Sequence, residues 1–317
     1  MATSKTLGHG NFKYKVESSW EVVPEGYEWR EVAGVITDSN DNVYVFNRSD
    51  HPMQVFDKGG NFLRSWGENI FTNAHGISLG PDNTIYCTDD GDHSVRQCTL
   101  DGKVILTIGM PGNPTPPFSG EPFNRCTHTA SDPDTGDIYV SDGYQNSRIH
   151  KYSPDGHLLF SWGQPGTDPG EFSIAHNIAT DSDGYVYLAD RENHRVQIFD
   201  RNGVFQDQWP NVHRPCGLFI DNDDRVYVAE LGWNGSVNRN VPNIGPRVSV
   251  LNKRGQVLAR LGEGYGTELG QFLSPHGICL DSSKNIYLGE VSRTNLTGLG
   301  ETVPDYLRTL QRLTKLA

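Results

Sequence analysis

Six copies of one pattern follow one another along this chain of 317 residues, and they constrain its fold more than any other feature. Each copy opens with a short apolar run, passes through a turn rich in Asp, Asn, Ser and Gly, and continues into a β-type run that contains Tyr. The opening residues are Ala33, His75, His128, His176, Cys216 and His276. A recurring unit of about 40–50 residues is typical of repeat architectures, in which every copy forms the same small piece of structure.

The copy that begins near residue 173 shows the strands of the unit most clearly. Its β-type runs at 174–180, 185–190, 195–199 and 204–209 are separated by polar turns that contain Asp and Gly. Turns of this kind between alternating apolar runs are the usual signals of β-hairpins. Four antiparallel strands repeated six times predict an all-β fold, a six-bladed β-propeller.

The whole chain, residues 1–317, is expected to form one such domain. The expected blades are residues 30–67, 72–109, 123–163, 173–209, 213–262 and 273–317, with the last one closed by residues 11–22. The N-terminal run 13–20 would supply the fourth strand that the last copy lacks, so that the two chain ends close the ring and remove an open sheet edge. An amphipathic helix over residues 306–316 is the alternative for the C-terminal segment.

The overall charge and the cysteine content bear on partners and compartment. A formal charge of -12 repels phosphate backbones, so we expect no nucleic acid partner. The chain contains no apolar run long enough to span a bilayer, and its first residues do not resemble a signal peptide. Together with an odd, scattered set of five cysteines, this predicts reduced thiols, a cytoplasmic location and no membrane partner.

Histidines stand at the same place in alternate copies. In a propeller the first strand of each blade lines the central channel, so His75, His176 and His276 are expected to converge on one point. Three neutral imidazoles with water or substrate in the fourth position are the composition of a catalytic zinc site. The alternative is a set of solvated channel histidines that the repeat supplies without a metal.

Two further motifs indicate a known repeat. The segments Ser141-Asp-Gly-Tyr-Gln-Asn-Ser-Arg-Ile and Ala189-Asp-Arg-Glu-Asn-His-Arg-Val, with the His-Gly-Ile openings, resemble the NHL repeat over roughly residues 30 to 290. The resemblance implies a six-bladed propeller. It does not fix the function, because NHL propellers serve as enzymes, RNA binders and scaffolds.

A narrower resemblance is to the peptidyl-α-hydroxyglycine α-amidating lyase family, a propeller whose channel zinc is held by three histidines of alternate blades. It implies that His75, His176 and His276 are the zinc ligands. The segments around Arg48, Tyr144 and Arg191 are similar to active-site segments of that family, which implies an arginine that orients substrate, a tyrosine base and a second substrate clamp.

The chain departs from the family pattern at several positions. The methionine two residues before the last histidine is Ser274, and the acidic residue of a structural calcium site is Gly277. The resemblance therefore does not extend to calcium, nor to the family's disulfide near the tyrosine, since Gln145 and Asn124 replace its cysteines. His128 and Cys216 open the two copies in between, and we expect them to line the channel or to lie behind the zinc ligands.

The resemblance implies a zinc-dependent lyase acting on a small α-hydroxylated amide or amine. The metal would hold the hydroxyl oxygen and stabilise its alkoxide, Tyr144 would take the proton, and Arg48 would orient the substrate. A metal-dependent hydrolase, hydratase or other C–X lyase on the same site is one alternative. A non-catalytic NHL propeller that binds a protein or a glycan is the other, with the insert at 231–246 as a binding surface or a lid over the channel.

Overall fold

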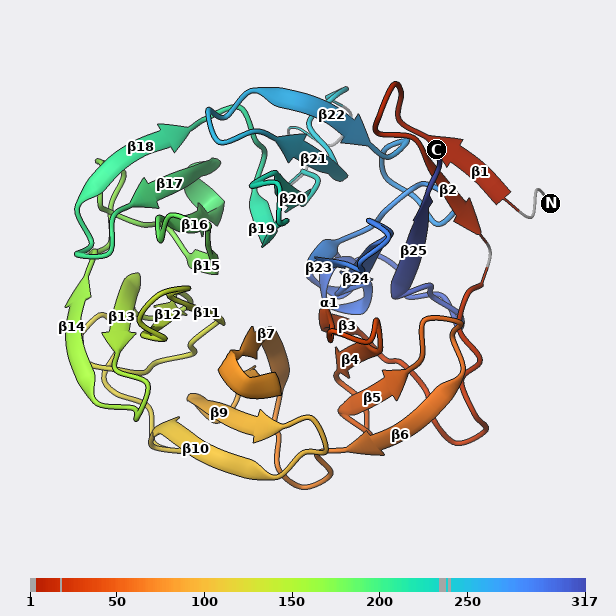
Figure 1. Ribbon diagram of the computed structural model, residues 1–317. Coiled ribbons are helices and arrows are strands. Elements are labelled where there is room, and N and C mark those ends of the chain that lie inside the picture. The colour runs from red at the N-terminus through yellow and green to blue at the C-terminus, as the bar shows by residue number, and fades with distance from the viewer. Residues whose placement is uncertain (1–3, 18, 234–237, 239–240) are drawn as a thin grey trace.

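The computed structural model describes residues 4–17, 19–233, 238 and 241–317. Part of the insert expected at 231–246 to form a lid or a binding surface, residues 234–237, 239 and 240, lies outside these ranges. The chain forms six antiparallel sheets arranged around a central axis, which confirms the predicted six-bladed β-propeller (Figure 1).

Five of the sheets contain four strands in chain order. The first comprises β3 (Val32–Thr37), β4 (Val43–Asn47), β5 (Met53–Phe56) and β6 (Phe62–Trp66). The second comprises β7 (Ala74–Gly80), β8 (Thr84–Asp89), β9 (Ser94–Thr99) and β10 (Val104–Gly109), with the short helix η1 (Pro81–Asn83) between β7 and β8. The third comprises β11 (His128–Ser131), β12 (Ile138–Asp142), β13 (Arg148–Tyr152) and β14 (Leu158–Trp162).

The remaining sheets follow the same plan. The fourth comprises β15 (Ala175–Thr180), β16 (Val186–Asp190), β17 (Arg195–Phe199) and β18 (Phe205–Trp209), with the short helix η2 (Arg191–Asn193) after β16. The fifth comprises β19 (Pro215–Ile220), β20 (Val226–Glu230), β21 (Arg247–Leu251) and β22 (Val257–Leu261). The innermost strands β3, β7, β11, β15, β19 and, in the sixth sheet, β23 (Pro275–Leu280) contact one another in a closed circuit, which makes them the wall of the channel.

The sixth sheet is built from both ends of the chain. Its order is β1 (Ser4–Leu7), β2 (Tyr14–Glu17), β25 (Leu310–Lys315), β24 (Ile286–Glu290) and β23 (Pro275–Leu280). The predicted closure by the N-terminal strand is confirmed, and the alternative of a C-terminal helix is wrong because Leu310 and Leu313 bury themselves in a strand. Strand β1 adds a fifth strand that the sequence did not predict.

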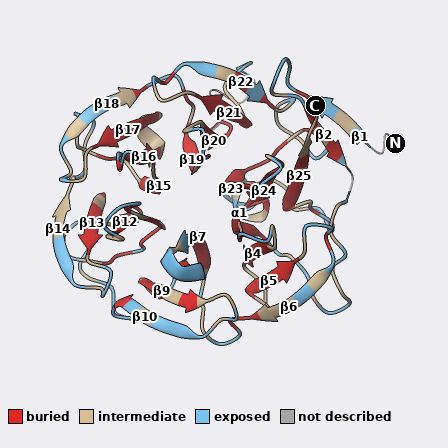
Figure 2. Cartoon of the chain, in the orientation of Figure 1, coloured by how far each residue is buried: buried red, intermediate tan, exposed pale blue. Residues whose placement is uncertain are grey.

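Burial between neighbouring sheets holds the ring together. The second and third strands of each sheet are almost wholly buried, whereas the outermost strands are half exposed (Figure 2). A buried tyrosine in the second strand donates its hydroxyl to an aspartate of the preceding turn in five sheets. The pairs are Asp38–Tyr44, Asp132–Tyr139, Asp181–Tyr187, Asp221–Tyr227 and Asp281–Tyr287. This bond explains the acidic turn followed by Tyr in these five repeats.

In five of the six sheets, a buried carboxylate at the end of the second strand fixes the loop that leads into the innermost strand. Asp142, Asp190 and Glu290, for example, accept backbone N–H groups of Asn124, Ser173 and Leu273. The matching residue of the second sheet is Asp89, which accepts from Thr72 and Asn73, and the adjacent Asp90 binds Arg125 instead. These carboxylates are structural, and they hold the loops at one end of the channel.

The only α-helix of the described ranges is α1 (Ser292–Gly298), a segment inserted between β24 and β25. With 7 residues it is far shorter than the about 20 that an apolar membrane-spanning helix requires. No helix among the described residues is long and apolar enough to cross a bilayer.

Candidate metal centre

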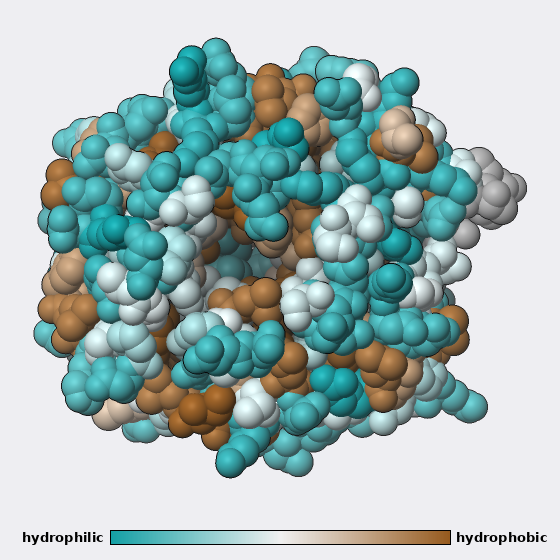
Figure 3. All heavy atoms as spheres, viewed as in Figure 1, coloured by the Kyte–Doolittle hydropathy of each residue, from teal (hydrophilic) through white to brown (hydrophobic). Residues whose placement is uncertain are grey.

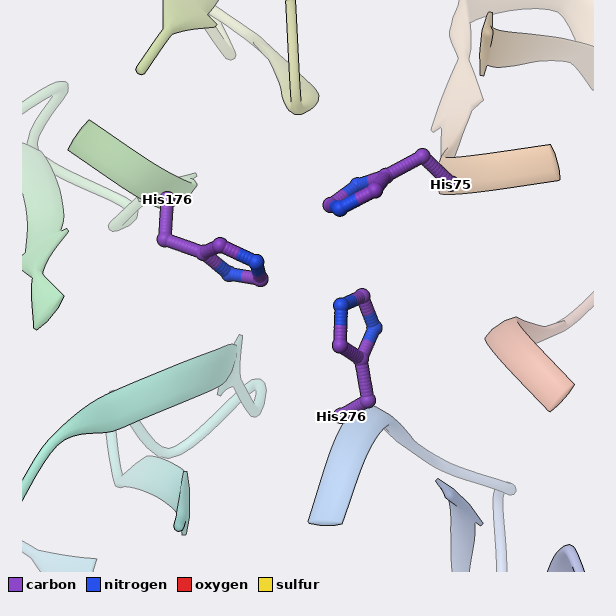
Figure 4. Close-up of side chains that lie close together, drawn as sticks. All are labelled: His75, His176 and His276. Carbon is purple, nitrogen blue, oxygen red and sulfur yellow. The ribbon is translucent and has the colours of Figure 1, made fainter. Parts of the chain in front are cut away.

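Three imidazoles meet at the centre of the ring. His75, His176 and His276 are each the second residue of an innermost strand, in the second, fourth and sixth sheets. Figure 4 shows the three rings pointing toward one another from these strands. One ring nitrogen from each residue lies within 4.8 Å of those of the other two, so the three residues could together hold a metal ion.

A β-bulge at each histidine explains why its side chain leaves the plane of the sheet. In β7 the pairing passes from Ala74 directly to Ile77, so that His75 and Gly76 share one partner position on β8. The same shift occurs at His176 and His276. A bulge bends the strand and redirects a side chain, and here it directs the imidazole into the channel.

Each histidine is fixed through its Nδ1 atom by a backbone carbonyl of the neighbouring sheet. The Nδ1–H of His75 donates to the carbonyl of Thr127 at 2.7 Å, that of His176 to Cys216 at 2.7 Å, and that of His276 to Ala33 at 2.6 Å. Because Nδ1 carries the proton, Nε2 has a free lone pair. A carbonyl that orients a metal-binding imidazole in this way is the usual supporting contact of zinc sites.

The electrostatic surroundings keep the three imidazoles neutral. Burial lowers their pKa values well below the ordinary value, and the guanidinium group of Arg191 lowers all three further, as does that of Arg48 for His75 and His276. A neutral imidazole is the form that binds metal ions. The donor set, three buried Nε2 lone pairs with no fourth protein ligand among the described residues, therefore fits zinc with one open position.

The hydroxyl of Tyr144 lies directly beside the histidines. It is 3.0 Å from Nε2 of His75 and 3.1 Å from Nε2 of His176, so it donates to one of these nitrogens at a time. Arg191 Nη1 lies 3.4 Å from the same hydroxyl. Burial raises the pKa of Tyr144, and the positive charge of Arg191 opposes that rise.

Arg48 and Arg191 occupy equivalent positions in opposite blades, each one residue after the second strand of its sheet. Arg48 donates through Nε to the carbonyl of Ala74 and through Nη1 to Glu31 at 2.9 Å. Both arginines lie at the same end of the channel as Tyr144, because the second strands of all blades end there. The structure thus brings both arginines to the mouth of the histidine site.

Of the other expected channel residues, two lie near the site and one lies below it. Cys216 Sγ is 3.6 Å from His176 Nδ1, and burial raises its pKa to about 11. Ser274 lines the same cavity as Tyr144. His128 lines the other part of the channel, because Thr127, not His128, is the residue that matches His75 in register.

A cavity of about 1430 Å³ opens above the histidines at this end of the channel. Its lining includes Arg48, Tyr144, Arg191, Cys216 and His276, together with α1 residues. A second cavity of about 370 Å³, lined mostly by apolar residues of the innermost strands, lies on the other side of His276. The central hollow is visible in the space-filling view (Figure 3).

Sequence reasoning missed Glu31, which connects Arg48 to helix α1. Glu31 is buried, accepts from Arg48 Nη1 and also accepts from the backbone N–H and the hydroxyl of Thr294. No local pattern could have shown this contact, because Glu31 and Thr294 are 263 positions apart. The only sign of this contact in the sequence is that an acidic residue immediately precedes the innermost strand β3.

Replacing Glu31 by Gln is expected to lower the free energy of unfolding by about 1–2 kcal/mol, because the buried guanidinium of Arg48 loses its charged partner. The denaturation midpoint measures this loss, and zinc content should not change. Glu25→Gln, at an exposed position, is the matched control. Equal midpoints for the two variants would show that the Glu31–Arg48 contact contributes nothing.

The fold and the site define a class: a six-bladed β-propeller with a three-histidine centre in its channel. The match to the NHL repeat model covers residues 172–199. Human NHL repeat-containing protein 3 is 31% identical over 234 residues, covering 69% of this chain and 67% of that protein. The chain therefore belongs to the family of NHL repeat-containing proteins.

Two other comparisons bear on chemistry and fold. Peptidyl-alpha-hydroxyglycine alpha-amidating lyase 1 of Drosophila melanogaster is 32% identical over 254 residues, which is 74% of this chain and 45% of the fly protein. A streptogramin B lyase structure superposes with a TM-score of 0.61 at 13% identity, covering 91% of this chain and 95% of that one. The first is a similarity to a lyase over less than half its length, and the second shows the fold alone.

Proposed function

We propose that the protein is a zinc-dependent lyase that cleaves the C–N bond of a small α-hydroxylated amide or amine. The arrangement that carries the proposal is the set of three oriented Nε2 atoms with the Tyr144 hydroxyl within 3.0–3.1 Å of two of them. The similarity to an amidating lyase supports the reaction class. The free state of all five cysteines supports action in a reducing compartment such as the cytoplasm.

His75, His176 and His276 would hold the zinc ion, which when bound supplies a Lewis acid that makes a substrate hydroxyl more acidic. A hydroxyl directed at the three Nε2 atoms lies beside the Tyr144 oxygen, because that oxygen is 3.0–3.1 Å from two of them. Tyr144, as phenolate, would accept the hydroxyl proton. Arg191 stabilises the phenolate by its charge and its 3.4 Å contact.

The bond changes balance within the site. As the hydroxyl proton moves to the Tyr144 oxygen, the C–O bond becomes a carbonyl and the C–N bond breaks with its electron pair going to nitrogen. The proton on Tyr144 then passes to that nitrogen, which leaves as an amide or amine. No water is consumed, so the reaction is a lyase reaction and not a hydrolysis.

Arg48 would orient the substrate. Its Nε and Nη1 atoms are held by Ala74 and Glu31, whereas no partner among the described residues holds Nη2. A guanidinium fixed on two sides and free on the third can bind a carboxylate or a developing oxyanion without losing side-chain entropy.

Tyr144→Phe is expected to lower kcat at least about 100-fold on N-acyl-α-hydroxyglycines, because a positioned proton acceptor is lost, while zinc content stays the same. Release of the aldehyde product measures kcat. Tyr185→Phe is the matched control, since Tyr185 is exposed and lies outside the channel.

Zinc-loaded protein that releases no carbonyl product from any N-acyl-α-hydroxyglycine, or equal rates for the two variants, would contradict the proposal. Products that contain the elements of an added water molecule would favour a hydrolase. Protein of full stability that contains no metal would favour a non-catalytic propeller.

A further inference from the structure

The large cavity above the histidines is rich in arginine although the protein as a whole carries a formal charge of -12. Among the described residues its lining contains no lysine, three acidic residues (Glu31, Asp50 and Glu68) and six arginines: Arg30, Arg48, Arg125, Arg191, Arg214 and Arg293. A planar guanidinium binds a carboxylate with two parallel hydrogen bonds, which an ammonium group cannot do. The composition of this wall therefore favours carboxylate ligands.

On one wall, two arginines share a single carboxylate. Arg191 Nε and Arg214 Nη2 each lie 2.9 Å from Glu192 Oε1, and a further 3.1 Å bond joins Arg214 Nε to Glu192 Oε2. The side chains of Arg191 and Arg214 are only 13% and 10% exposed. This group, the Glu192 cluster, thus holds one positive charge more than it can neutralise, largely out of water.

Glu192 is the only carboxylate that pairs with Arg191 or Arg214 among the described residues. Burial opposes ionisation of Glu192, but Arg214 and Arg191 lower the pKa of its carboxyl to about 2. An unbalanced charge in a largely buried cluster is costly unless a ligand of opposite charge neutralises it.

The opposite wall carries a second group of the same kind. Arg48 comes from the first sheet and Arg191 from the fourth, which face each other across a six-membered ring. Glu31 accepts from Arg48, and Arg293 of α1 lines the same cavity with its Nε buried and without a partner among the described residues. We call Arg48, Arg293 and Glu31, which line this cavity, the Glu31 cluster. It holds two guanidinium groups and one carboxylate, and the carboxylates of Asp50 and Glu68 line the same cavity.

The other end of the channel differs. Among the described residues, the cavity of about 370 Å³ below the histidines is lined by no Arg, Lys, Asp or Glu side chain. The excess of guanidinium groups therefore belongs to the arginine-lined mouth and is not a general property of the channel.

We propose that the ligand of this cavity is a small dicarboxylate, with one carboxylate bound by the Glu31 cluster and the other by the Glu192 cluster. A ligand with one negative group leaves one wall unneutralised. The inference rests on the proposed function in that the dicarboxylate is taken to be the α-hydroxylated substrate itself. The substrate class is thereby narrowed from any N-acyl-α-hydroxyglycine to one whose acyl group also carries a carboxylate.

Binding of unreactive probes tests this directly. Glutarate and adipate are compared by calorimetry with glutaramate and adipamate, their monoamides of the same length, on zinc-loaded and on zinc-free protein. At least one diacid is expected to bind about tenfold or more tightly than its monoamide in both forms, because each charge-assisted pair is worth at least that factor. Equal affinities of diacids and monoamides would overturn the proposal.

Variants locate the second carboxylate. Arg214→Met is expected to remove the preference for the diacid, whereas Arg254→Met, at an exposed position outside the cavity, retains it. Arg293→Met, which changes the less buried α1 arginine, is expected to weaken the preference from the other wall and serves if Arg214→Met does not fold. A preference that survives both cavity variants would overturn the proposal.

The result separates this inference from the proposed lyase activity. If the protein prefers diacids but does not cleave the C–N bond, the two-carboxylate site is supported and the lyase activity is contradicted. If N-acyl-α-hydroxyglycines with an uncharged acyl group are cleaved at the same kcat/KM as those with a carboxylate on it, the lyase activity is supported and the two-carboxylate site is contradicted.

Discussion

Alanine at both His75 and His176 is expected to abolish zinc binding while the protein remains folded. Wild-type protein purified without added metal should contain close to one zinc per chain, and the double variant close to none. The remaining ligand, His276, cannot hold the ion alone, because changes in supporting contacts alone already cost about 10–100-fold in affinity and loss of two ligands costs more. Elemental analysis of the purified proteins measures the difference.

The control for this experiment is His128→Ala, which removes an imidazole from the same channel but from outside the cluster. It should retain zinc. In the double variant, the carbonyls of Thr127 and Cys216 lose their donors, so a moderate loss of stability of about 1–3 kcal/mol for each is expected. Wild-type protein without metal, or a double variant that keeps it, would contradict the proposed centre.

The repeat predicted the fold well because every copy carries its own structural contacts. The acidic turn and the buried tyrosine of one copy bond to each other within about ten residues, so their spacing is visible in sequence. The same regularity predicted that His75, His176 and His276 meet, since equal positions in equivalent strands must lie at one level of the channel.

What could not be predicted are the contacts between copies. The Glu31–Thr294 bond joins the first copy to an insertion in the last, and Arg214 reaches Glu192 from the next blade. His128 lines the channel, but its equivalence with His75 was off by one residue, since the carbonyl of Thr127 is the one that accepts from His75. The bulge that the three histidine strands share has no signature in a single sequence. Such contacts depend on tertiary packing, which local patterns do not encode.

Burial also bears on the chemistry of Tyr144. A tyrosine base needs a lowered phenol pKa, but desolvation outweighs the charge of Arg191 and raises the pKa of Tyr144. The sequence identified the neighbours of this phenol without showing how deeply it is buried. For Tyr144 to act as a base, the positive charge of the metal ion must therefore lower its pKa in addition to Arg191.

Val16→Asp is expected to destabilise the whole ring by at least about 3 kcal/mol. Val16 is fully buried in β2, pairs with Leu313 of β25 and packs in the core between the fifth and sixth sheets. A carboxylate at this position has no partner, and burial of an unpaired charge is among the few changes that cost this much. The midpoint of thermal or denaturant unfolding measures the loss.

Lys15→Asp introduces the same residue on the solvent side of the same strand, where Lys15 forms an exposed ion pair with Glu17. It should cost no more than about 1 kcal/mol, because exposed pairs contribute little. His276 belongs to the sheet that β2 closes, so Val16→Asp should also release zinc at a lower temperature, and the two losses should coincide. Equal unfolding midpoints for Val16→Asp and Lys15→Asp would show that the ring does not depend on its N-terminal strand. Zinc that stays bound above the unfolding midpoint of Val16→Asp would show that the histidines do not need a closed ring to meet.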